Sequence, residues 1–250
     1  MIGAAMLVTS ACDTKVEGYC PYGKSRTLML LDRTTPYDET DRANLNDGLV
    51  RLAGSLGVGD ELVIRTITDT PATSAQVFDK CRPGCPPQGV TDWLFSGCRT
   101  VVARRDYQQF EKDLVASILP LTHNAESYKH SEIIRTVSSV TADYPAKHFE
   151  RVVVFTDLLE NSPSVLPFPS ITSLPAEEML GRVANLDIQP ALAGAEVTVF
   201  GFGRAHDPDR TALAADLSQR VRKFWNAYFK SGGAADVRIG QNLRVESGTD

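Results

Sequence analysis

The chain has 250 residues, of which 42% are hydrophobic and 23% are charged, a composition that is ordinary for a folded globular protein. The net charge is −5 and no long run of Lys and Arg occurs, which argues against a nucleic-acid-binding surface. No stretch reaches the roughly 18 to 20 apolar residues that are needed to cross a bilayer.

The first residues resemble an export signal. Residues 2–8 are a short apolar segment, and small residues follow them up to Cys12. A cysteine placed in this way is typical of a bacterial lipoprotein, in which Cys12 would carry the lipid. We therefore expect residues 1–24 to be the signal and tether of an exported protein, either periplasmic or anchored to the membrane. The alternative is a small apolar N-terminal strand with an unrelated cysteine.

Four further cysteines form an even set: Cys20, Cys81, Cys85 and Cys98. In an exported chain such a set indicates two disulfides, with three connectivities to choose from. The spacing from Cys81 to Cys98 is also within reach of a four-thiolate zinc site. We favour disulfides, because the N-terminus points to an oxidising compartment.

The first half of the chain alternates strands and helices. Residues 27–32 read as a buried strand that ends at Asp32, and Asp38 can cap a helix that follows it. A second strand is expected at residues 61–67. After these come, in order, a Cys-, Pro- and Gly-rich insertion at about 68–98, a short edge strand at 99–103 and a helix at about 106–118.

The second half repeats this rhythm. We expect a helix from about Ser131, a strand ending at Asp157, a helix at 176–186, a strand at 196–200, a long amphipathic helix and a last strand at 236–239. On the long helix, Trp225 and Phe229 either widen the buried face or form an interaction patch. No linker separates two cores, so we expect one domain over residues 25–240 and a tail over 241–250.

This pattern predicts an α/β fold, with a carboxylate at the end of each of two buried strands. The organisation resembles the von Willebrand factor A-type (VWA) domain over about residues 25–240. The resemblance implies a doubly wound, mostly parallel six-stranded sheet in the order 3-2-1-4-5-6, with helices on both faces and an antiparallel edge strand. In that order Asp32 and Asp157 lie at one crevice, at the edge of the sheet where ligands bind.

The resemblance also implies a metal site built from an Asp-x-Ser-x-Ser loop, a threonine and a second aspartate. Asp32 and Thr34 match the first two positions, but the third is Pro36, which has no side-chain oxygen. Ser131 is expected on the second loop and Asp157 after strand 4. Oxygen ligands of this kind suit Mg²⁺ or Mn²⁺, and water can fill a position that the protein leaves open.

Each of these residues also has a structural interpretation. Ser131 can cap the helix that follows it. Asp32 and Asp157 can accept backbone hydrogen bonds without any metal, and Arg33 can neutralise Asp32 in place of a cation.

We expect the domain to bind another protein and to use Asp32, Thr34, Ser131 and Asp157 as direct or water-mediated cation ligands. One alternative is the same scaffold binding a partner without metal. The other is a magnesium-dependent phosphohydrolase that uses Asp32 and Asp157. No hydrolase or phosphate-binding motif occurs, and the four histidines show no ligand spacing and read as surface or loop residues, so the sequence favours binding over catalysis.

Overall fold

The computed structural model describes residues 18–35, 37–86, 98–123, 128–144, 149–167, 170–206 and 209–244. The expected lipidation residue Cys12 and the loop residue Pro36 lie outside these ranges, as do residues 245–250 of the expected tail. None of the helices in the described part of the chain is long and apolar enough to span a membrane.

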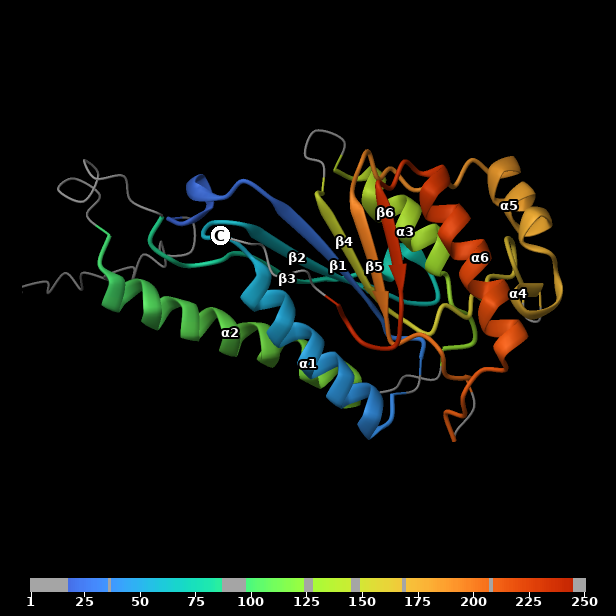
Figure 1. The fold of residues 1–250 in the computed structure, drawn as a ribbon, viewed down its shortest axis with the longest axis horizontal. Coiled ribbons are helices and arrows are strands. Elements are labelled where there is room, and N and C mark those ends of the chain that lie inside the picture. The colour runs from blue at the N-terminus through green and yellow to red at the C-terminus, as the bar shows by residue number, and fades with distance from the viewer. Residues whose placement is uncertain are drawn as a thin grey trace, which may run out of the picture.

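Six strands form a single sheet in the order β3-β2-β1-β4-β5-β6, in which β3 alone is antiparallel to its neighbour (Figure 1). This confirms the predicted fold class and strand order. The strands are β1 Arg26–Asp32, β2 Glu61–Ile67, β3 Gln76–Cys81, β4 Arg151–Phe155, β5 Glu196–Phe200 and β6 Asp236–Ile239. The four central strands are parallel, so their carboxyl ends lie at one edge of the sheet, which we call the carboxyl edge.

The helices lie on both faces of the sheet (Figure 1). On one side are α1 and α2, and on the other are α3, α5 and α6, with the short helix α4 beside them. Their bounds are α1 Glu39–Ser55, α2 Thr100–His123, α3 Ile133–Ala142, α4 Ser170–Ser173, α5 Ala176–Asn185 and α6 Ala215–Ser231. Two short 3₁₀ turns complete the described elements, η1 at Cys20–Tyr22 and η2 at Pro71–Thr73.

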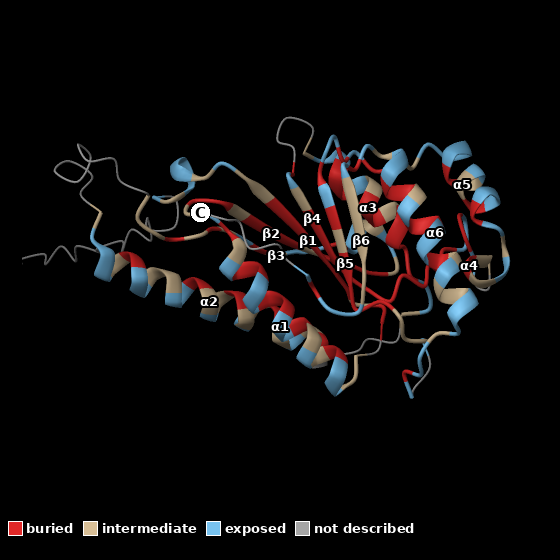
Figure 2. Ribbon diagram, in the orientation of Figure 1, coloured by how far each residue is buried: buried red, intermediate tan, exposed pale blue. Residues whose placement is uncertain are grey.

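The sheet has a hydrophobic core on each face, and buried residues run along its central strands (Figure 2). Along β1, Leu28 and Leu30 pack toward the α3 and α6 side, whereas Met29 and Leu31 pack toward α1 and α2. This alternation follows from the two-residue period of a strand. It explains why β1 reads as a continuous apolar run, since a strand covered on both faces needs apolar side chains on each.

The aromatic residues of α6 belong to the core and not to an exposed patch. Trp225 and Phe229 are both fully buried, together with Phe224 and Tyr228. The Trp225 indole N–H donates a hydrogen bond of 2.9 Å to the carbonyl of Leu158. The alternative of an interaction surface at these residues is therefore wrong.

The predicted edge strand at residues 99–103 is also wrong, because residues 100–103 form the start of α2. The helical spacing of Phe110, Leu114 and Ile118 extends back to the buried Ala103, while Val101 on the opposite face is 81% exposed. The antiparallel edge strand is β3, within the predicted insertion. Its sequence is polar because it lies at the edge, where Phe78 and Cys81 are its buried side chains.

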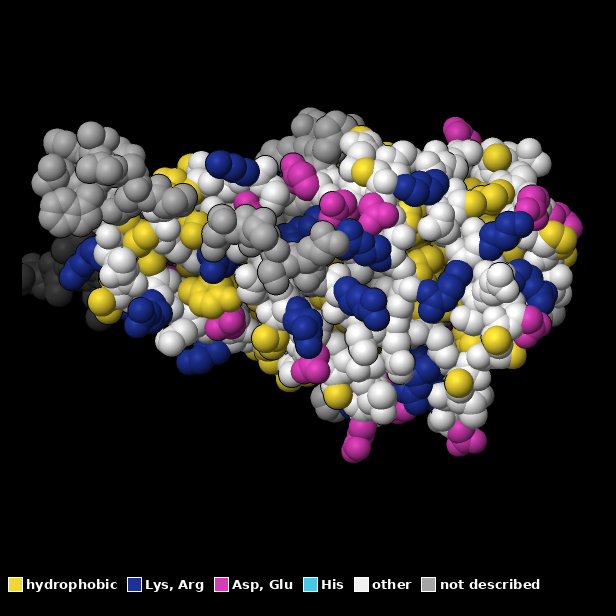
Figure 3. Space-filling view, in the orientation of Figure 1, with side chains coloured by type: hydrophobic (Ala, Val, Ile, Leu, Met, Phe, Trp, Pro, Cys, Tyr) yellow, Lys and Arg dark blue, Asp and Glu magenta, His cyan; other side chains and the backbone are white. Residues whose placement is uncertain are grey.

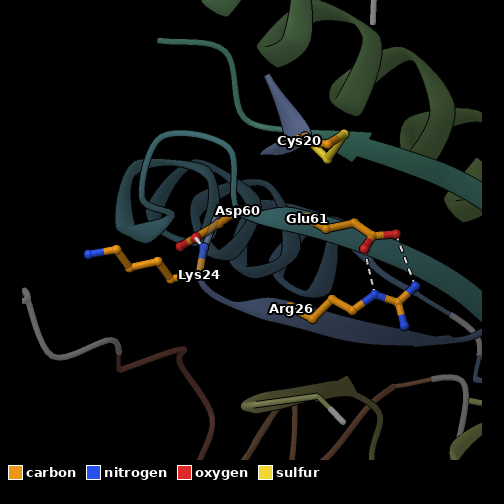
Figure 4. The surroundings of a disulfide bond; sticks show 6 residues. Cys20, Lys24, Arg26, Asp60 and Glu61 are labelled. Carbon is orange, nitrogen blue, oxygen red and sulfur yellow. Dashed lines mark hydrogen bonds and ion pairs between the residues drawn. A yellow bond between two sulfur atoms is a disulfide. The ribbon is translucent and has the colours of Figure 1, made fainter. Parts of the chain in front are cut away.

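The opposite edge of the sheet, which we call the amino edge, carries two disulfides, Cys20–Cys81 and Cys85–Cys98. These bonds confirm the disulfide prediction against the zinc alternative, and they are typical of proteins from an oxidising compartment. Figure 4 shows the first disulfide near the start of β1, where Arg26 and Glu61 form a two-bond ion pair at 2.5 and 2.9 Å. Asp60 accepts a hydrogen bond from the backbone N–H of Lys24. The segment before β1 is thereby held against β2 and β3.

Lys and Arg side chains gather on the face where β6 and α6 lie (Figure 3). Two basic side chains of α6 bind the backbone at β6, the last strand of the sheet: Lys230 donates to the carbonyl of Ala235, just before β6, at 2.6 Å, and Arg222 donates to the carbonyl of Ile239. Positive side chains along an edge strand oppose pairing with other strands. The two hydrogen bonds also hold α6 on β6.

Candidate functional site

Asp32 is the last residue of β1, at the carboxyl edge, and it is fully buried. Its Oδ1 accepts hydrogen bonds from the backbone N–H of Thr34 at 2.9 Å and from the Thr34 hydroxyl at 2.6 Å. Its Oδ2 accepts a third from the hydroxyl of Thr156, at 2.6 Å. Burial, followed by the nearby charge of Asp157, raises the pKa of Asp32, and the hydroxyl bonds only partly offset this. The three hydrogen bonds hold the carboxylate in one orientation.

Ser131 joins this group from a different loop, just before α3. Its Oγ lies 2.7 Å from Oγ1 of Thr34, so Asp32, Thr34 and Ser131 form one hydrogen-bonded chain. Two backbone hydrogen bonds with Asn161, at 3.0 and 3.1 Å, fix the position of Ser131. Its structural interpretation as a helix cap is wrong, because α3 starts at Ile133 and its N-cap residue is Glu132, whose side chain makes no cap hydrogen bond.

Asp157 follows β4, and it is buried beside the same group. Its Oδ1 accepts a hydrogen bond of 3.0 Å from the N–H of Leu159. Its Oδ2 lies 3.2 Å from Nδ1 of His206 and 3.2 Å from Nη1 of Arg210. Burial by itself would raise the pKa of Asp157, but the bond and charge of His206 and the charge of Arg210 together hold it below its ordinary value.

The sequence analysis missed the contribution of the loop between β5 and α6. Arg210 is buried, and besides Asp157 it binds Asp41 of α1 through a hydrogen bond of 3.0 Å. Arg204 of the same loop donates to Asp38 at 2.8 Å and to Asp41 at 3.0 Å. Arg210 is thus a guanidinium that contacts the predicted site residue Asp157 and that the sequence analysis did not single out.

His206 lies in a loop, as predicted, and it also contacts the site through Asp157. The hydrogen bond to Asp157 raises the pKa of His206 above its ordinary value, although burial opposes this. Its side chain remains 42% exposed and lines the site. The position of Arg210 and His206 in the sequence gives a signal for both. They lie in the loop after the parallel strand β5, and a loop after a parallel strand begins at the carboxyl edge.

Among the contacts given above, carboxylates outnumber guanidinium groups. Four carboxylates, those of Asp32, Asp38, Asp41 and Asp157, meet the two guanidinium groups of Arg204 and Arg210. With every acid ionised, the cluster keeps two negative charges when His206 is neutral and one when it is protonated. Excess negative charge in a buried place favours either a bound proton or a bound cation.

A cavity of about 290 Å³ opens in front of these residues. The hydroxyl-bearing Thr34 and Ser131 line it, together with His206, Lys129 and His130. Its walls therefore combine neutral oxygen donors with side chains that can carry positive charge. The described residues contain no group of three or more His, Cys, Asp or Glu side chains placed to hold a metal. The oxygens gathered here come from hydroxyls and from two carboxylates.

This donor set fits a hard divalent cation. Thr34 and Ser131 place two hydroxyl oxygens at the cavity wall, and the carboxylate of Asp32 lies directly behind them. Mg²⁺ binds through one or two carboxylates and keeps several waters, so such a partial set of protein oxygens is sufficient. All four predicted ligand residues lie at the carboxyl edge, with Asp157 engaged by cationic side chains.

A scan against models of protein families finds no match to this chain, and a search of curated proteins finds none either.

Proposed function

We propose that this chain is a VWA-like protein-binding module that contacts its partner through the carboxyl edge of the sheet and uses a divalent cation, Mg²⁺ or Mn²⁺, to do so. The hydrogen-bonded chain of Asp32, Thr34 and Ser131, which opens into the 290 Å³ cavity, is the observation that carries this proposal. The bound cation would supply a coordination position for a carboxylate of the partner.

The sheet order and the origin of the site residues support the assignment to a VWA-like domain. The neighbouring central strand β1 ends at Asp32, the loop after β4 carries Asp157, and Ser131 comes from another loop at the same edge. Assembly from three loops around the point where the strand order reverses is the usual position of ligand sites in open α/β sheets.

The residues around the proposed ligands keep them in place before any cation binds. Thr156 fixes one oxygen of Asp32, Leu159 fixes one oxygen of Asp157, and Asn161 fixes the backbone of Ser131. A site that is already ordered loses little conformational entropy on binding. The carboxylates of the cluster add an electrostatic attraction for a cation.

A second candidate is the same surface acting without metal. The observation in its favour is Arg210, which already supplies a positive charge to Asp157. In this case a carboxylate of the partner would meet His206, Lys129 and the hydroxyls of Thr34 and Ser131 directly. Both candidates use one surface, and they differ in whether an added cation stabilises the protein.

We also propose that the module is exported and tethered by a lipid on Cys12. The disulfides support maturation in an oxidising compartment. The segment that leads into β1 lies at the amino edge, opposite the site (Figure 1). A tether at that end would direct the carboxyl edge away from the membrane. Mass spectrometry of protein recovered from cells tests this point, since an unmodified Cys12 contradicts it.

Thermal unfolding with and without excess Mg²⁺ or Mn²⁺ tests the central proposal. At about 100 times its dissociation constant, a ligand of the native state adds roughly 2.7 kcal/mol to the free energy of unfolding. We expect this gain in the wild type, its loss in Asp32→Asn and Thr34→Val, and its retention in Asp47→Asn, which removes an exposed carboxylate of α1. No gain in the wild type leaves the metal-free candidate. Release of phosphate from simple esters that Asp157→Ala abolishes would instead support the phosphohydrolase.

A further inference from the structure

Basic side chains from two different loops line the cavity at the carboxyl edge. Lys129 and His130 come from the segment that leads into α3, and His206 comes from the loop between β5 and α6. None of the described residues that line this cavity is an aspartate or a glutamate. The wall therefore offers positive charge and hydrogen-bond donors to an anion.

The nitrogens of these three side chains are available to a ligand. The His206 ring uses Nδ1 for Asp157, at 3.2 Å, and its Nε2 has no partner in the described part of the chain. Lys129 and His130 are exposed, and within the described residues neither side chain makes a hydrogen bond or an ion pair. The guanidinium of Arg210 differs, because it is already bonded to carboxylates.

The contact between His206 and Asp157 prepares the ring for an anion. Asp157 is 2% exposed and lies behind the cavity wall, where Arg210 also binds it. Its hydrogen bond with Nδ1 fixes the ring and leaves Nε2 for the cavity. The same bond raises the pKa of His206, which favours the charged imidazolium. Asp32 is fully buried and lies behind Thr34, so neither acid reaches the cavity.

We propose that this cavity binds the phosphate group of a small solute and that Lys129, His130 and His206 are its ligands. A phosphate group carries nearly two negative charges at neutral pH and has three strong acceptor oxygens, so it can meet all three side chains at once. A carboxylate has one charge and two oxygens. The cavity of about 290 Å³ is at the small end of the range of about 300–1,000 Å³ that is usual for ligand pockets, which suits a small molecule. This inference goes beyond the proposed function and needs no divalent cation.

A phosphate group can belong to a free solute or to a lipid headgroup, and the position of the cavity favours the solute. The segment that leads into β1 lies at the amino edge, on the opposite side of the sheet from the cavity (Figure 1). The tether proposed above would therefore hold the cavity away from the membrane.

The test is a titration of the full chain with inorganic phosphate in metal-free buffer, followed by calorimetry. We expect saturable binding that Lys129→Gln, His130→Gln and His206→Gln each weaken by about tenfold, because each change removes one charge-assisted hydrogen bond. Lys129→Arg keeps the positive charge and should retain most of the affinity. Thermal unfolding of each variant without phosphate verifies that it is folded.

Lys24 provides a matched control. It is an exposed lysine at the amino edge, and its side chain points away from the neighbouring strands (Figure 4). Lys24→Gln lowers the net charge as much as Lys129→Gln does, but away from the cavity, so it should bind phosphate like the wild type. Equal losses in these two variants would overturn the site, because the effect would be one of overall charge.

Three further results would contradict the proposal. Acetate should bind more weakly than phosphate by about tenfold or more, since it forms fewer charged hydrogen bonds, and equal affinities would show a carboxylate pocket instead. Binding to vesicles of phosphatidylcholine and phosphatidic acid that Lys129→Gln abolishes would overturn the assignment to a solute. Absence of saturable binding at millimolar phosphate would overturn the anion site itself. The proposed function has its own test with Mg²⁺ or Mn²⁺, so either proposal can fail while the other stands.

Discussion

Arg210 Nη1 lies 3.2 Å from Oδ2 of Asp157, and each of these side chains is only 2% exposed. The same guanidinium binds Asp41, so it connects the N-terminal turn of α1 with the end of β4. A buried charge that loses its partner is expensive, because little water can replace the lost interaction. Arg210 is therefore a structural connection, and it would also compete with a bound cation for the carboxylate of Asp157.

Replacement of Arg210 by Gln should lower the free energy of unfolding by about 3–5 kcal/mol, because Asp41 and Asp157 lose a buried cation. Urea denaturation measures this change. The control is Arg182→Gln, which breaks a surface pair with Glu178 at 3.0 Å and should cost less than about 1 kcal/mol.

Added Mn²⁺ should recover part of the loss in Arg210→Gln, because a cation can then occupy the freed oxygen of Asp157. The recovery should exceed the stabilisation that Mn²⁺ gives to the wild type. An Arg210→Gln variant that unfolds like Arg182→Gln, with or without Mn²⁺, would contradict the role assigned to the guanidinium.

Glu160 predicts a specific dependence of stability on pH. It is fully buried, it accepts a hydrogen bond of 3.0 Å from Ile134 N–H, and its Oε1 has no partner among the described residues. Burial, assisted by the charge of Glu132, raises the pKa of Glu160 to about 8. The folded state therefore holds a proton that the unfolded state releases above its ordinary pKa of 4.5.

The stabilisation by this proton is complete below pH 4.5 and is lost as the pH rises to 8. Linkage converts such a shift into an effect of order 4 kcal/mol. Urea denaturation across this range should show the decline in the wild type and a much smaller decline in Glu160→Gln, which stays neutral. Parallel curves for the two proteins would show that Glu160 is not the group responsible.

The disulfides predict two losses of different size. The Cys20–Cys81 bond spans 61 residues and the Cys85–Cys98 bond spans 13. In the chain-entropy model, removing them costs about 4 and about 3 kcal/mol, because the larger loop restricts the unfolded chain more. Denaturation of the Cys20→Ala/Cys81→Ala and Cys85→Ala/Cys98→Ala variants measures both, and peptide mapping identifies the bonds. Other pairings, or a stoichiometric zinc ion on free thiols, would contradict the structure.

The parts of the fold that could be predicted from the sequence are those with a strong hydrophobic period. The strands β1 and β4 are buried on both faces, so the sequence predicts them from their apolar runs, together with the aspartate that ends β1 and the one that follows β4. The sequence does not predict the edge strand β3, because its outer position leaves it few buried side chains. The β-branched residues Val101 and Val102 locally favour a strand. They are helical in the structure because they belong to α2, whose Phe110 and Leu114 pack in the core.

The site divides in the same way. Asp32, Thr34, Ser131 and Asp157 could be predicted because each stands at a boundary between an apolar element and a loop. Arg210 and His206 lie in a loop without periodicity, about 50 residues after Asp157, and only the folded sheet brings them beside it. The pairing of the cysteines likewise depends on spatial proximity, since spacing left three connectivities.

Localisation of Mn²⁺ by NMR tests the central claim most directly, because a paramagnetic ion broadens the amide signals near it. On addition of Mn²⁺ to the uniformly labelled full chain, we predict selective broadening of the amides of Thr34, Ser131 and Leu158, at the carboxyl edge. The amides of Cys20 and Cys81, at the amino edge, should remain sharp, and Asp32→Asn should abolish the effect. An unchanged spectrum at millimolar Mn²⁺, or broadening centred elsewhere, would contradict a cation site built on Asp32, Thr34 and Ser131.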